Sequence, residues 1–206
     1  MPSEQMPATR ALRAAATGTA LLGLSGFAAR SRSVSVAERR VFERLNSGIG
    51  VAEGPVWAVM QAGNGLTAVV APAVLLGLGR PMSDAARVGG AAFGGWHLAK
   101  LVKRALPRGR PASLLDGVVL RDGNPAGGGF VSGHATVATA TSVAIGSMLG
   151  PRVQRAAGAT ALVVALARVH VGAHLPLDVI GGVGLGLLWG SLCASLPVPR
   201  RPESFS

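Results

Sequence analysis

The stretch Ala167–Leu196, ARVHVGAHLPLDVIGGVGLGLLWGSLCASL, decides the fold of this chain. Its second part, from Leu175 onward, is apolar and contains one charged residue, Asp178. A run of this length predicts a membrane-spanning helix, which needs about 20 apolar residues. Its first part places Arg168 and His174 at the boundary with the preceding apolar run. Because ionisable side chains at a membrane helix end are costly, these residues indicate a functional site.

Apolar runs of helical length recur along the chain, and they lack the alternation expected of strands. The longest charge-free run, Pro55–Gly79, has 25 residues. The others are Ala14–Ala29, Val88–Ala99 with its continuation to Leu106, Ala135–Gly150 and Ala156–Ala167. We therefore predict an all-α fold, an integral-membrane helical bundle of about six transmembrane helices. The one long connection, Pro107–Phe130, is rich in glycine and proline and is predicted to be an active-site loop between the third and fourth helices.

The first apolar run, Ala14–Ala29, allows three interpretations. Two arginines before it and small residues at its end are typical of a signal peptide. It also fits a first transmembrane helix or an interfacial amphipathic helix. We favour the transmembrane helix, because six spans place both termini on one side. The chain then divides into an N-terminal region, 1–54, with this helix and a polar surface helix that has no chemical role, a membrane core, 55–196, and a C-terminal tail, 197–206.

The composition supports a membrane protein with an anion site. The chain has 206 residues, of which 49% are hydrophobic and 14% charged, and its mean hydropathy is +0.44. Soluble domains carry about 25% charged residues. The net charge of +11 comes from arginines in short groups between apolar runs, so we interpret it as membrane flanks plus an anion site and predict no nucleic-acid partner. The single cysteine, Cys193, cannot form an internal disulfide and is predicted to pack in a helix.

Three short stretches supply groups that bind phosphate, and the first contains Lys103, Arg110 and Pro111. An arginine fork grips two phosphate oxygens, and a lysine adds a point charge. Lys103 stands at the end of a predicted helix, and Arg110 lies in the loop that follows. The alternative is that the cations of this region only reach from the helix end to the membrane surface; they are Lys100, Lys103, Arg104 and Arg108.

The second stretch, Ser132-Gly133-His134, follows three glycines and opens an apolar helix. Backbone N–H groups at a helix N-terminus favour an anion. Ser132 can cap the helix and donate to phosphate, and Gly133 allows close approach of the backbone. His134 can protonate a leaving-group oxygen. The alternative is an ordinary serine cap beside an interfacial histidine.

The third stretch contains Arg168, His174 and Asp178. Pro176 suits the first turn of the last helix, so Asp178 falls in that turn, just after His174. We expect the carboxylate to accept a hydrogen bond from one ring nitrogen and to leave the other free to attack phosphorus. The alternative for Asp178 is a carboxylate that only complements the helix dipole. His170 is predicted to be structural or to line the pocket.

The same side chains could also be considered as a metal site. Three histidines and one aspartate are enough ligands for zinc; they are His134, His170, His174 and Asp178. The sequence has no compact HExxH or Cys/His pair, and three cations around the site would repel a divalent metal. We therefore predict no metal and no cofactor.

Together the three stretches resemble the type-2 phosphatidic acid phosphatase superfamily, which also includes vanadium haloperoxidases. The family pattern is K-x6-R-P, then P-S-G-H, then S-R-x5-H-x3-D, and here the motif residues occur in order with their internal spacing intact. Two positions depart from the pattern, since Val131 replaces a proline and Ala167 replaces a serine. The first change should leave the loop less rigid, and the second removes one hydroxyl donor. Neither touches the expected nucleophile, acid or cations.

The resemblance implies a role for each matching residue. His174 attacks phosphorus and forms a phosphohistidine, Asp178 orients His174, and His134 protonates the leaving oxygen. The phosphate is held by Lys103, Arg110, Ser132, the Gly133 amide and Arg168. Water then cleaves the intermediate, and no metal takes part.

Lipid phosphates are the expected substrates, since the site is surrounded by apolar runs. The candidates are phosphatidic acid, phosphatidylglycerol phosphate and polyprenyl phosphates or diphosphates. Two alternatives are a membrane protein that only binds phosphorylated lipid and a vanadate-dependent haloperoxidase, against which the apolar spans and short length argue. We expect the bilayer as a partner and a plasma membrane of bacterial type, and nothing in the sequence indicates an oligomeric state. Six spans would make the site face outward, whereas five would place it inside and better satisfy the positive-inside rule.

Overall fold

The computed structural model describes residues 7–31, 33–47, 53–122 and 126–196, and within them the regular structure is helical. The helices are α1 (Ala8–Ala29), α2 (Val36–Ser47), α3 (Glu53–Met60), the 3-10 helix η1 (Gln61–Gly63), α4 (Thr67–Gly77), α5 (Met82–Ala105), α6 (Pro111–Leu114), α7 (Gly133–Leu149), α8 (Pro151–His170) and α9 (Pro176–Ser195). The prediction of an all-α bundle is confirmed. The predicted tail, 197–206, and residues 48–52 of the N-terminal region lie outside the described residues.

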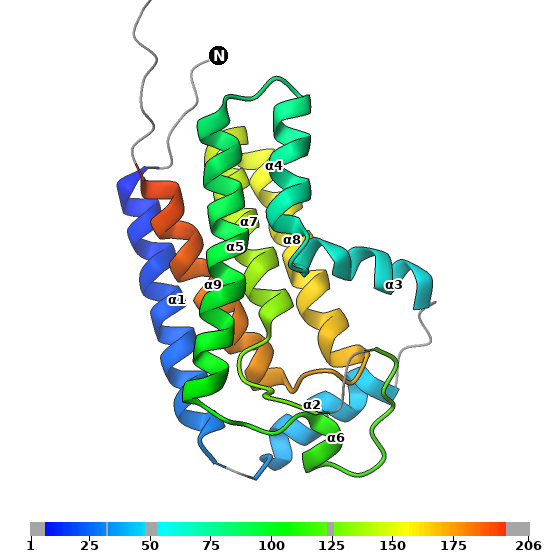
Figure 1. Cartoon of the computed structure of the whole chain (residues 1–206). Coiled ribbons are helices and arrows are strands. Elements are labelled where there is room, and N and C mark those ends of the chain that lie inside the picture. The colour runs from blue at the N-terminus through cyan, green and yellow to red at the C-terminus, as the bar shows by residue number, and fades with distance from the viewer. Residues whose placement is uncertain (1–6, 32, 48–52, 123–125, 197–206) are drawn as a thin grey trace, which may run out of the picture.

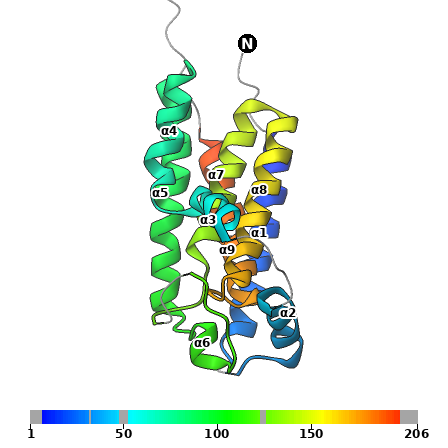
Figure 2. The same cartoon turned by 90° about the vertical axis from the view of Figure 1, so that its right-hand side faces the viewer.

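The longer helices stand side by side, and α9 packs between its neighbours (Figures 1 and 2). It contacts α1, α5 and α7, while α8 packs on α7 and α4 packs on α5. The start of α1 and the end of α9 lie together at the upper end of the view in Figure 1. Helices α2 and α6 lie across the opposite end, and α3 projects to the side. The bundle therefore has one end that carries the described chain ends and another that is covered by short helices.

The run Pro55–Gly79, predicted to be long enough to span a membrane, is bent in the structure. Its two parts, Gly54–Gly63 and Thr67–Gly77, meet at an angle of 84°. The break lies at Asn64, whose side-chain carbonyl accepts the backbone N–H of Leu66 at 2.8 Å. Such local bonds compete with helical ones. The bend also seats Gly63 against α7, where an added Cβ would lie 2.5 Å from the carbonyl oxygen of His134.

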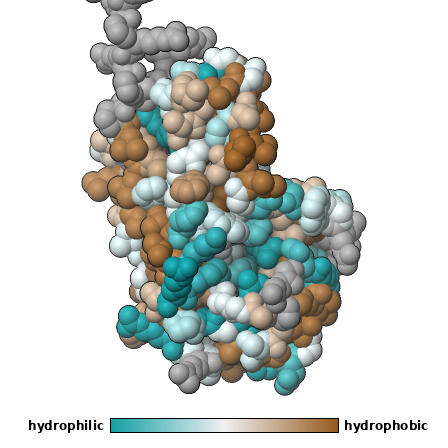
Figure 3. Space-filling model, in the orientation of Figure 1, coloured by the Kyte–Doolittle hydropathy of each residue, from teal (hydrophilic) through white to brown (hydrophobic). Residues whose placement is uncertain are grey.

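Membrane character is visible in one helix and in the outer surface. Among the described helices, α9 is long and apolar enough to cross a membrane, and the bent pair would be a second such segment if it counts as one. Large apolar side chains are exposed on the outside of several helices; they include Leu24 and Phe27 of α1, Val69, Val70 and Val74 of α4, Phe93 of α5, and Leu162 and Leu166 of α8. Figure 3 shows hydrophobic residues along the upper and left parts of the molecule and hydrophilic ones over its lower middle. An exposed apolar surface of this kind marks contact with a membrane or with another protein.

Candidate active site

The predicted site residues lie at or next to the ends of helices in the lower part of the bundle. Lys103 lies in the last turn of α5, Arg168 near the end of α8, and Ser132 just before α7. His174 lies in the short connection before α9, and Asp178 in the first turn of α9. Residues from three distant stretches of sequence are therefore brought to one end of the molecule, as the motif spacing predicted.

A pocket of about 240 Å³ opens at this end of the bundle. Six of the eight predicted site residues line it; they are Lys103, Arg110, Gly133, His134, Arg168 and His174. Ser132 and Asp178 are fully buried and lie behind the wall of this pocket rather than in it. With Lys100, which also lines it, the pocket thus combines four cations, two histidines and a helix N-terminus, which is a donor set that suits a phosphate dianion.

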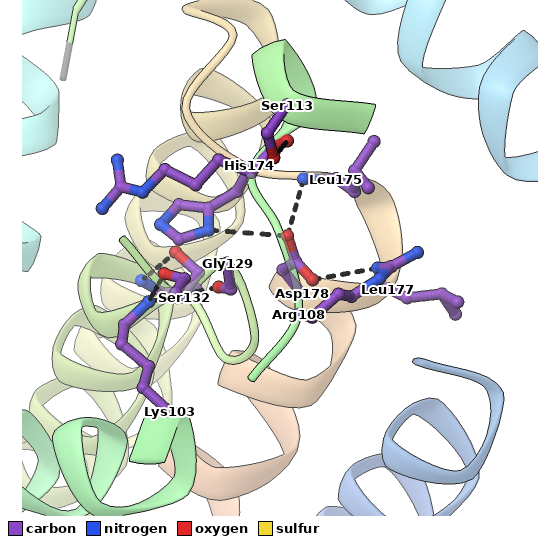
Figure 4. A network of polar contacts seen from close by, with 12 residues as sticks. Lys103, Arg108, Ser113, Gly129, Ser132, His174, Leu175, Leu177 and Asp178 are labelled. Carbon is purple, nitrogen blue, oxygen red and sulfur yellow. Dashed lines mark hydrogen bonds and ion pairs between the residues drawn. The ribbon is translucent and has the colours of Figure 1, made fainter. Parts of the chain in front are cut away.

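Asp178 lies between His174 and Arg108 (Figure 4). Its Oδ2 is 3.7 Å from Nδ1 of His174 and accepts the backbone N–H of Leu175 at 2.9 Å. The first distance is longer than a hydrogen bond, and Nδ1 has no other partner among the described residues. The two side chains therefore face each other, but the predicted hydrogen bond between them is not formed at this distance. Burial lowers the pKa of His174 to about 4, so the ring is neutral at pH 7.

The cations are held in different ways. The ammonium group of Lys103 donates to the carbonyl oxygens of Gly128 and Gly129 at 2.8 and 3.1 Å. Gly129 also passes close to Asp178, since an added Cβ would lie 3.0 Å from Oδ2 of that carboxylate. Arg110 and Arg168 both line the pocket, and burial together with the positive charge of Arg168 lowers the pKa of Arg110.

Ser132 caps the start of α7, as the sequence predicted, but it does not line the pocket. The hydroxyl oxygen of Ser132 accepts the N–H of Ala135 at 3.5 Å, and the backbone N–H of Ser132 donates to the carbonyl oxygen of Asp178 at 2.8 Å. Ser132 therefore joins the first turns of α7 and α9, and its buried hydroxyl serves the cap. His134 enters the pocket, where its ring lies edge-on to Trp96 with 6.1 Å between the ring centres.

Several residues near the site were not predicted to act there. Trp96 and Lys100 line the pocket, and Asp122 forms an ion pair of 2.8 Å with Arg168. Arg108, which was interpreted as a membrane flank, is buried and donates to Asp178 at 2.9 Å. Glu38, on the surface helix without an expected role, contacts Arg108. The stretch R-G-R-P could have indicated a site role for Arg108, because it lies two positions before Arg110 and both side chains can point to one site. Nothing in the sequence around Glu38 indicates a role at the site.

The described residues contain no group of three or more histidine, cysteine, aspartate or glutamate side chains that could hold a metal ion. His170, one of the ligands considered for zinc, points elsewhere, since its Nδ1 lies 2.9 Å from the carbonyl oxygen of Leu45 in α2. It takes part in the packing of α2 on α8, in agreement with the predicted structural role. The side chains that do converge on the pocket are suited to an anion.

A comparison with protein families matches residues 85–202 to the PAP2 superfamily, a match that includes more than half of the chain. The chain belongs to the PAP2 superfamily. The resemblance predicted from the three motifs is thereby confirmed, and all eight predicted site residues fall inside the matched region.

Among curated PAP2 relatives, two lipid A 1-phosphatases, from Rhizobium johnstonii and Rhizobium etli, are each 38% identical over 107 residues. These matches cover 50% of this chain and 43% and 45% of the relatives, so the chain spans less than half of the proteins that it matches. Two solved structures share the fold. LpxE from Aquifex aeolicus has a TM-score of 0.66 at 20% identity, covering 75% of this chain and 92% of that one. A transmembrane PAP2-type phosphatidylglycerolphosphate phosphatase from Bacillus subtilis has a TM-score of 0.61 at 22% identity, covering 84% and 92%.

Proposed function

We propose that this PAP2 protein is an integral-membrane lipid phosphatase that works through a phosphohistidine and needs no metal. The observation that carries the proposal is the position of a buried, neutral His174 in a pocket that also holds Lys103, Arg110, Arg168 and His134. A neutral imidazole has a lone pair for attack, and fixed cations stabilise the charge that develops on the phosphoryl oxygens.

The geometry suggests how the steps are divided. Nδ1 of His174 faces Asp178, so Nε2 is left to attack phosphorus. The new N–P bond forms as the P–O bond to the lipid breaks, and His134 gives a proton to the leaving oxygen. Water then attacks the phosphohistidine, gives its proton to His134, and releases inorganic phosphate. The cations and the N-terminus of α7 hold the phosphoryl group during both steps.

The proposed substrate is a phosphate or diphosphate monoester of a lipid. The pocket lies at one end of a bundle whose sides carry exposed apolar residues, so a headgroup can reach it while its hydrocarbon tail stays in the bilayer. The named activities of the relatives add lipid A to the expected panel of phosphatidic acid, phosphatidylglycerol phosphate and polyprenyl phosphates. We further propose about six spans, formed by α1, the bent pair, α5, α7, α8 and α9, in a bacterial plasma membrane with the site outward.

Phosphate release by the purified protein in detergent, with EDTA present, tests the proposal. The panel is lipid A, phosphatidic acid, phosphatidylglycerol phosphate and undecaprenyl diphosphate. We expect release from at least one of them, and a loss of at least about 10³-fold in His174→Ala, because removal of a nucleophile leaves only binding and electrostatic catalysis. In a second measurement, the reaction with 32P-labelled substrate is quenched rapidly and the protein is denatured without acid. 32P should then remain bound to the wild-type chain and be absent from His174→Ala.

The matched control is His97→Ala, since His97 is an exposed histidine on the outside of α5. It should keep the wild-type rate. Release that EDTA abolishes would contradict the metal-independent mechanism. Binding of a lipid phosphate that His174→Ala leaves unchanged, with no turnover by either protein, would favour a lipid-binding protein instead.

A further inference from the structure

Glu38, Arg108 and Asp178 form a chain of buried charges behind the pocket. The Arg108 guanidinium donates from Nη1 to Oε1 of Glu38 at 3.0 Å and to Oδ1 of Asp178 at 2.9 Å, and from Nη2 to Oε2 of Glu38 at 2.6 Å. The side chains of Arg108, Glu38 and Asp178 are 3%, 5% and 0% exposed. One guanidinium therefore lies between two carboxylates. One of these, Asp178, faces His174 (Figure 4).

Both carboxylates also bind the first turn of α9. Oε1 of Glu38 accepts the backbone N–H of Leu177 at 3.0 Å, and Oδ2 of Asp178 accepts that of Leu175 at 2.9 Å. Negative charge at a helix N-terminus is favourable, and these bonds satisfy N–H groups that have no partner within the helix. Glu38, from a helix near the start of the chain, thus helps to fix the turn that carries Asp178.

The position of Glu38 is itself fixed by one face of α2. The buried residues of this helix are Glu38, Phe42 and Asn46, which are spaced four apart and so lie in one stripe. Asn46 donates to the carbonyl oxygens of Val119 and His170, both at 2.8 Å. The far end of α2 is therefore held by contacts that do not involve Glu38. Docking of α2 does not by itself account for the buried ion pair of Glu38 and Arg108.

We infer that Glu38 and Arg108 are positioning residues that hold the Asp178 carboxylate toward the ring of His174. Both oxygens of Asp178 are occupied on the sides away from the ring, by Arg108 and by the Leu175 N–H, so the carboxylate cannot rotate freely. A carboxylate that orients a reacting histidine acts only when its own direction is set. The inference rests on the proposed function, because it assigns these residues to the nucleophile of that reaction.

A purely structural role of Glu38 and Arg108 would require their ion pair to contribute to the stability of the fold. Burying an ion pair gives little net stability, because desolvation of both charges offsets their attraction. Docking of α2 is already provided by Phe42 and Asn46, and by Arg121, which donates to the carbonyl oxygens of Asn46 and His170. The structural and positioning roles differ in one measurable respect, since a positioning residue must act through Asp178.

The test is a double-mutant cycle on the full-length protein in detergent, with the best lipid phosphate of the panel. Glu38→Gln removes the charge and keeps the shape. We expect kcat to fall roughly 10- to 100-fold, as for other groups that orient a reacting side chain. KM should stay within about twofold, because the cations that line the pocket are untouched. In the Asp178→Asn background, Glu38→Gln should cause no further loss of kcat.

The control is Glu43→Gln, the same change on the exposed face of α2, which should match the wild type. An unchanged kcat in Glu38→Gln would overturn the inference, and so would an equal loss of kcat with and without Asp178. Where Glu38→Gln does not fold, judged by its melting temperature, Arg108→Lys replaces it with Arg104→Lys as its exposed match. Lysine keeps the charge but its shorter side chain has one nitrogen and cannot reproduce the fork of Nη1 and Nη2 that holds both carboxylates, so the same fall in kcat and the same dependence on Asp178 are expected.

A wild type that releases no phosphate from any lipid of the panel counts against the proposed function and removes the inference with it. An active wild type whose Glu38 and Arg108 variants keep full kcat counts against the inference alone.

Discussion

Asp122 and Arg168 form an ion pair at the edge of the pocket, and phosphate would have to compete with it. The carboxylate lies 2.8 Å from Nη1 of Arg168, and its side chain is 40% exposed, whereas that of Arg168 is 5% exposed. A partly exposed carboxylate is weakly held, since exposed ion pairs contribute at most about 1 kcal/mol. We therefore expect Asp122 to neutralise Arg168 until an anion replaces it, and so to weaken anion binding in the pocket.

Asp122→Asn should therefore strengthen anion binding. The variant keeps the shape of the side chain and removes the competing charge, so we expect KM for lipid phosphate and the inhibition constant of inorganic phosphate to fall by roughly two- to fivefold. The measurement is inhibition of phosphate release at fixed substrate. Asp116→Asn is the matched control, because Asp116 is an exposed carboxylate of the same loop. Weaker inhibition by phosphate in Asp122→Asn would show that Asp122 serves the pocket in another way.

At the residue scale, the sequence predicted six residues that line the pocket, and Ser132 and Asp178 behind it, but missed the residues that hold Asp178. The lining residues that were predicted stand in short motifs with a fixed spacing; they include Lys103, Arg110, His134 and His174. Arg108, which contacts Asp178, lies in the loop 70 positions earlier, and Glu38, which contacts Arg108, lies in α2 another 70 positions earlier. Such contacts depend on how helices pack, and helix packing leaves no fixed spacing in the sequence.

Among the elements, α1 and α9 approach so closely that only glycine fits at their contact. An added Cβ on Gly18 would lie 2.6 Å from the carbonyl oxygen of Gly184, and one on Gly184 would lie 2.6 Å from the backbone nitrogen of Leu22. Small residues let membrane helices pack backbone to backbone, where van der Waals contact replaces the hydrophobic effect. The same helix α9 carries Asp178 at its other end, so this contact fixes the axis on which the site is built.

Gly18→Ala should destabilise the protein by about 1–3 kcal/mol, because the methyl group meets backbone atoms that cannot move alone. Gly23→Ala, on the same helix, is the matched control: nothing lies within 4 Å of its Cβ position. This second change should be neutral or stabilising by up to about 1 kcal/mol, since alanine favours a helix. Thermal unfolding in one detergent compares the two. Equal melting temperatures for Gly18→Ala and the wild type would mean that α1 does not pack on α9 in this way.

The elements themselves were predictable where the sequence is uniform. Apolar runs without charge predicted α1, α7, α8 and α9 as helices, and the structure contains all four. The bend within Pro55–Gly79 was not predicted, because an apolar run records burial or lipid contact and carries no information about direction. The small residues Gly63-Asn64-Gly65 at the bend were a signal for a break, and the contact of Gly63 with His134 shows what the bend accomplishes: it supports the start of α7 at the site.

For the whole molecule, the two ends of the bundle differ in a way that bears on membrane orientation. The described chain ends lie together at one end (Figure 1), and the pocket lies toward the other, where α5 ends and α7 begins. If the bundle crosses the bilayer, the pocket and the chain ends are on opposite sides. Exposed cations near the pocket, including Arg39, Arg40, Arg44, Lys100 and Arg104, oppose an outward site by the positive-inside rule. These arginines and lysines would equally suit the attraction of an anionic headgroup to the pocket.

Single cysteines at the two ends distinguish these explanations. Because the sequence contains one cysteine, Cys193→Ala gives a background without thiols. In it, Ala112→Cys lies on exposed α6 beside the pocket, and Arg152→Cys lies on the exposed start of α8 at the other end. A membrane-impermeant maleimide applied to intact cells should label the first and should label the second only after permeabilisation, because a charged reagent does not cross the hydrocarbon core. The reverse pattern would place the pocket in the cytoplasm. The distribution of positive charge, and not the number of spans, would then determine the orientation of the protein in the membrane. Equal labelling of both without permeabilisation would contradict a bundle that spans the membrane.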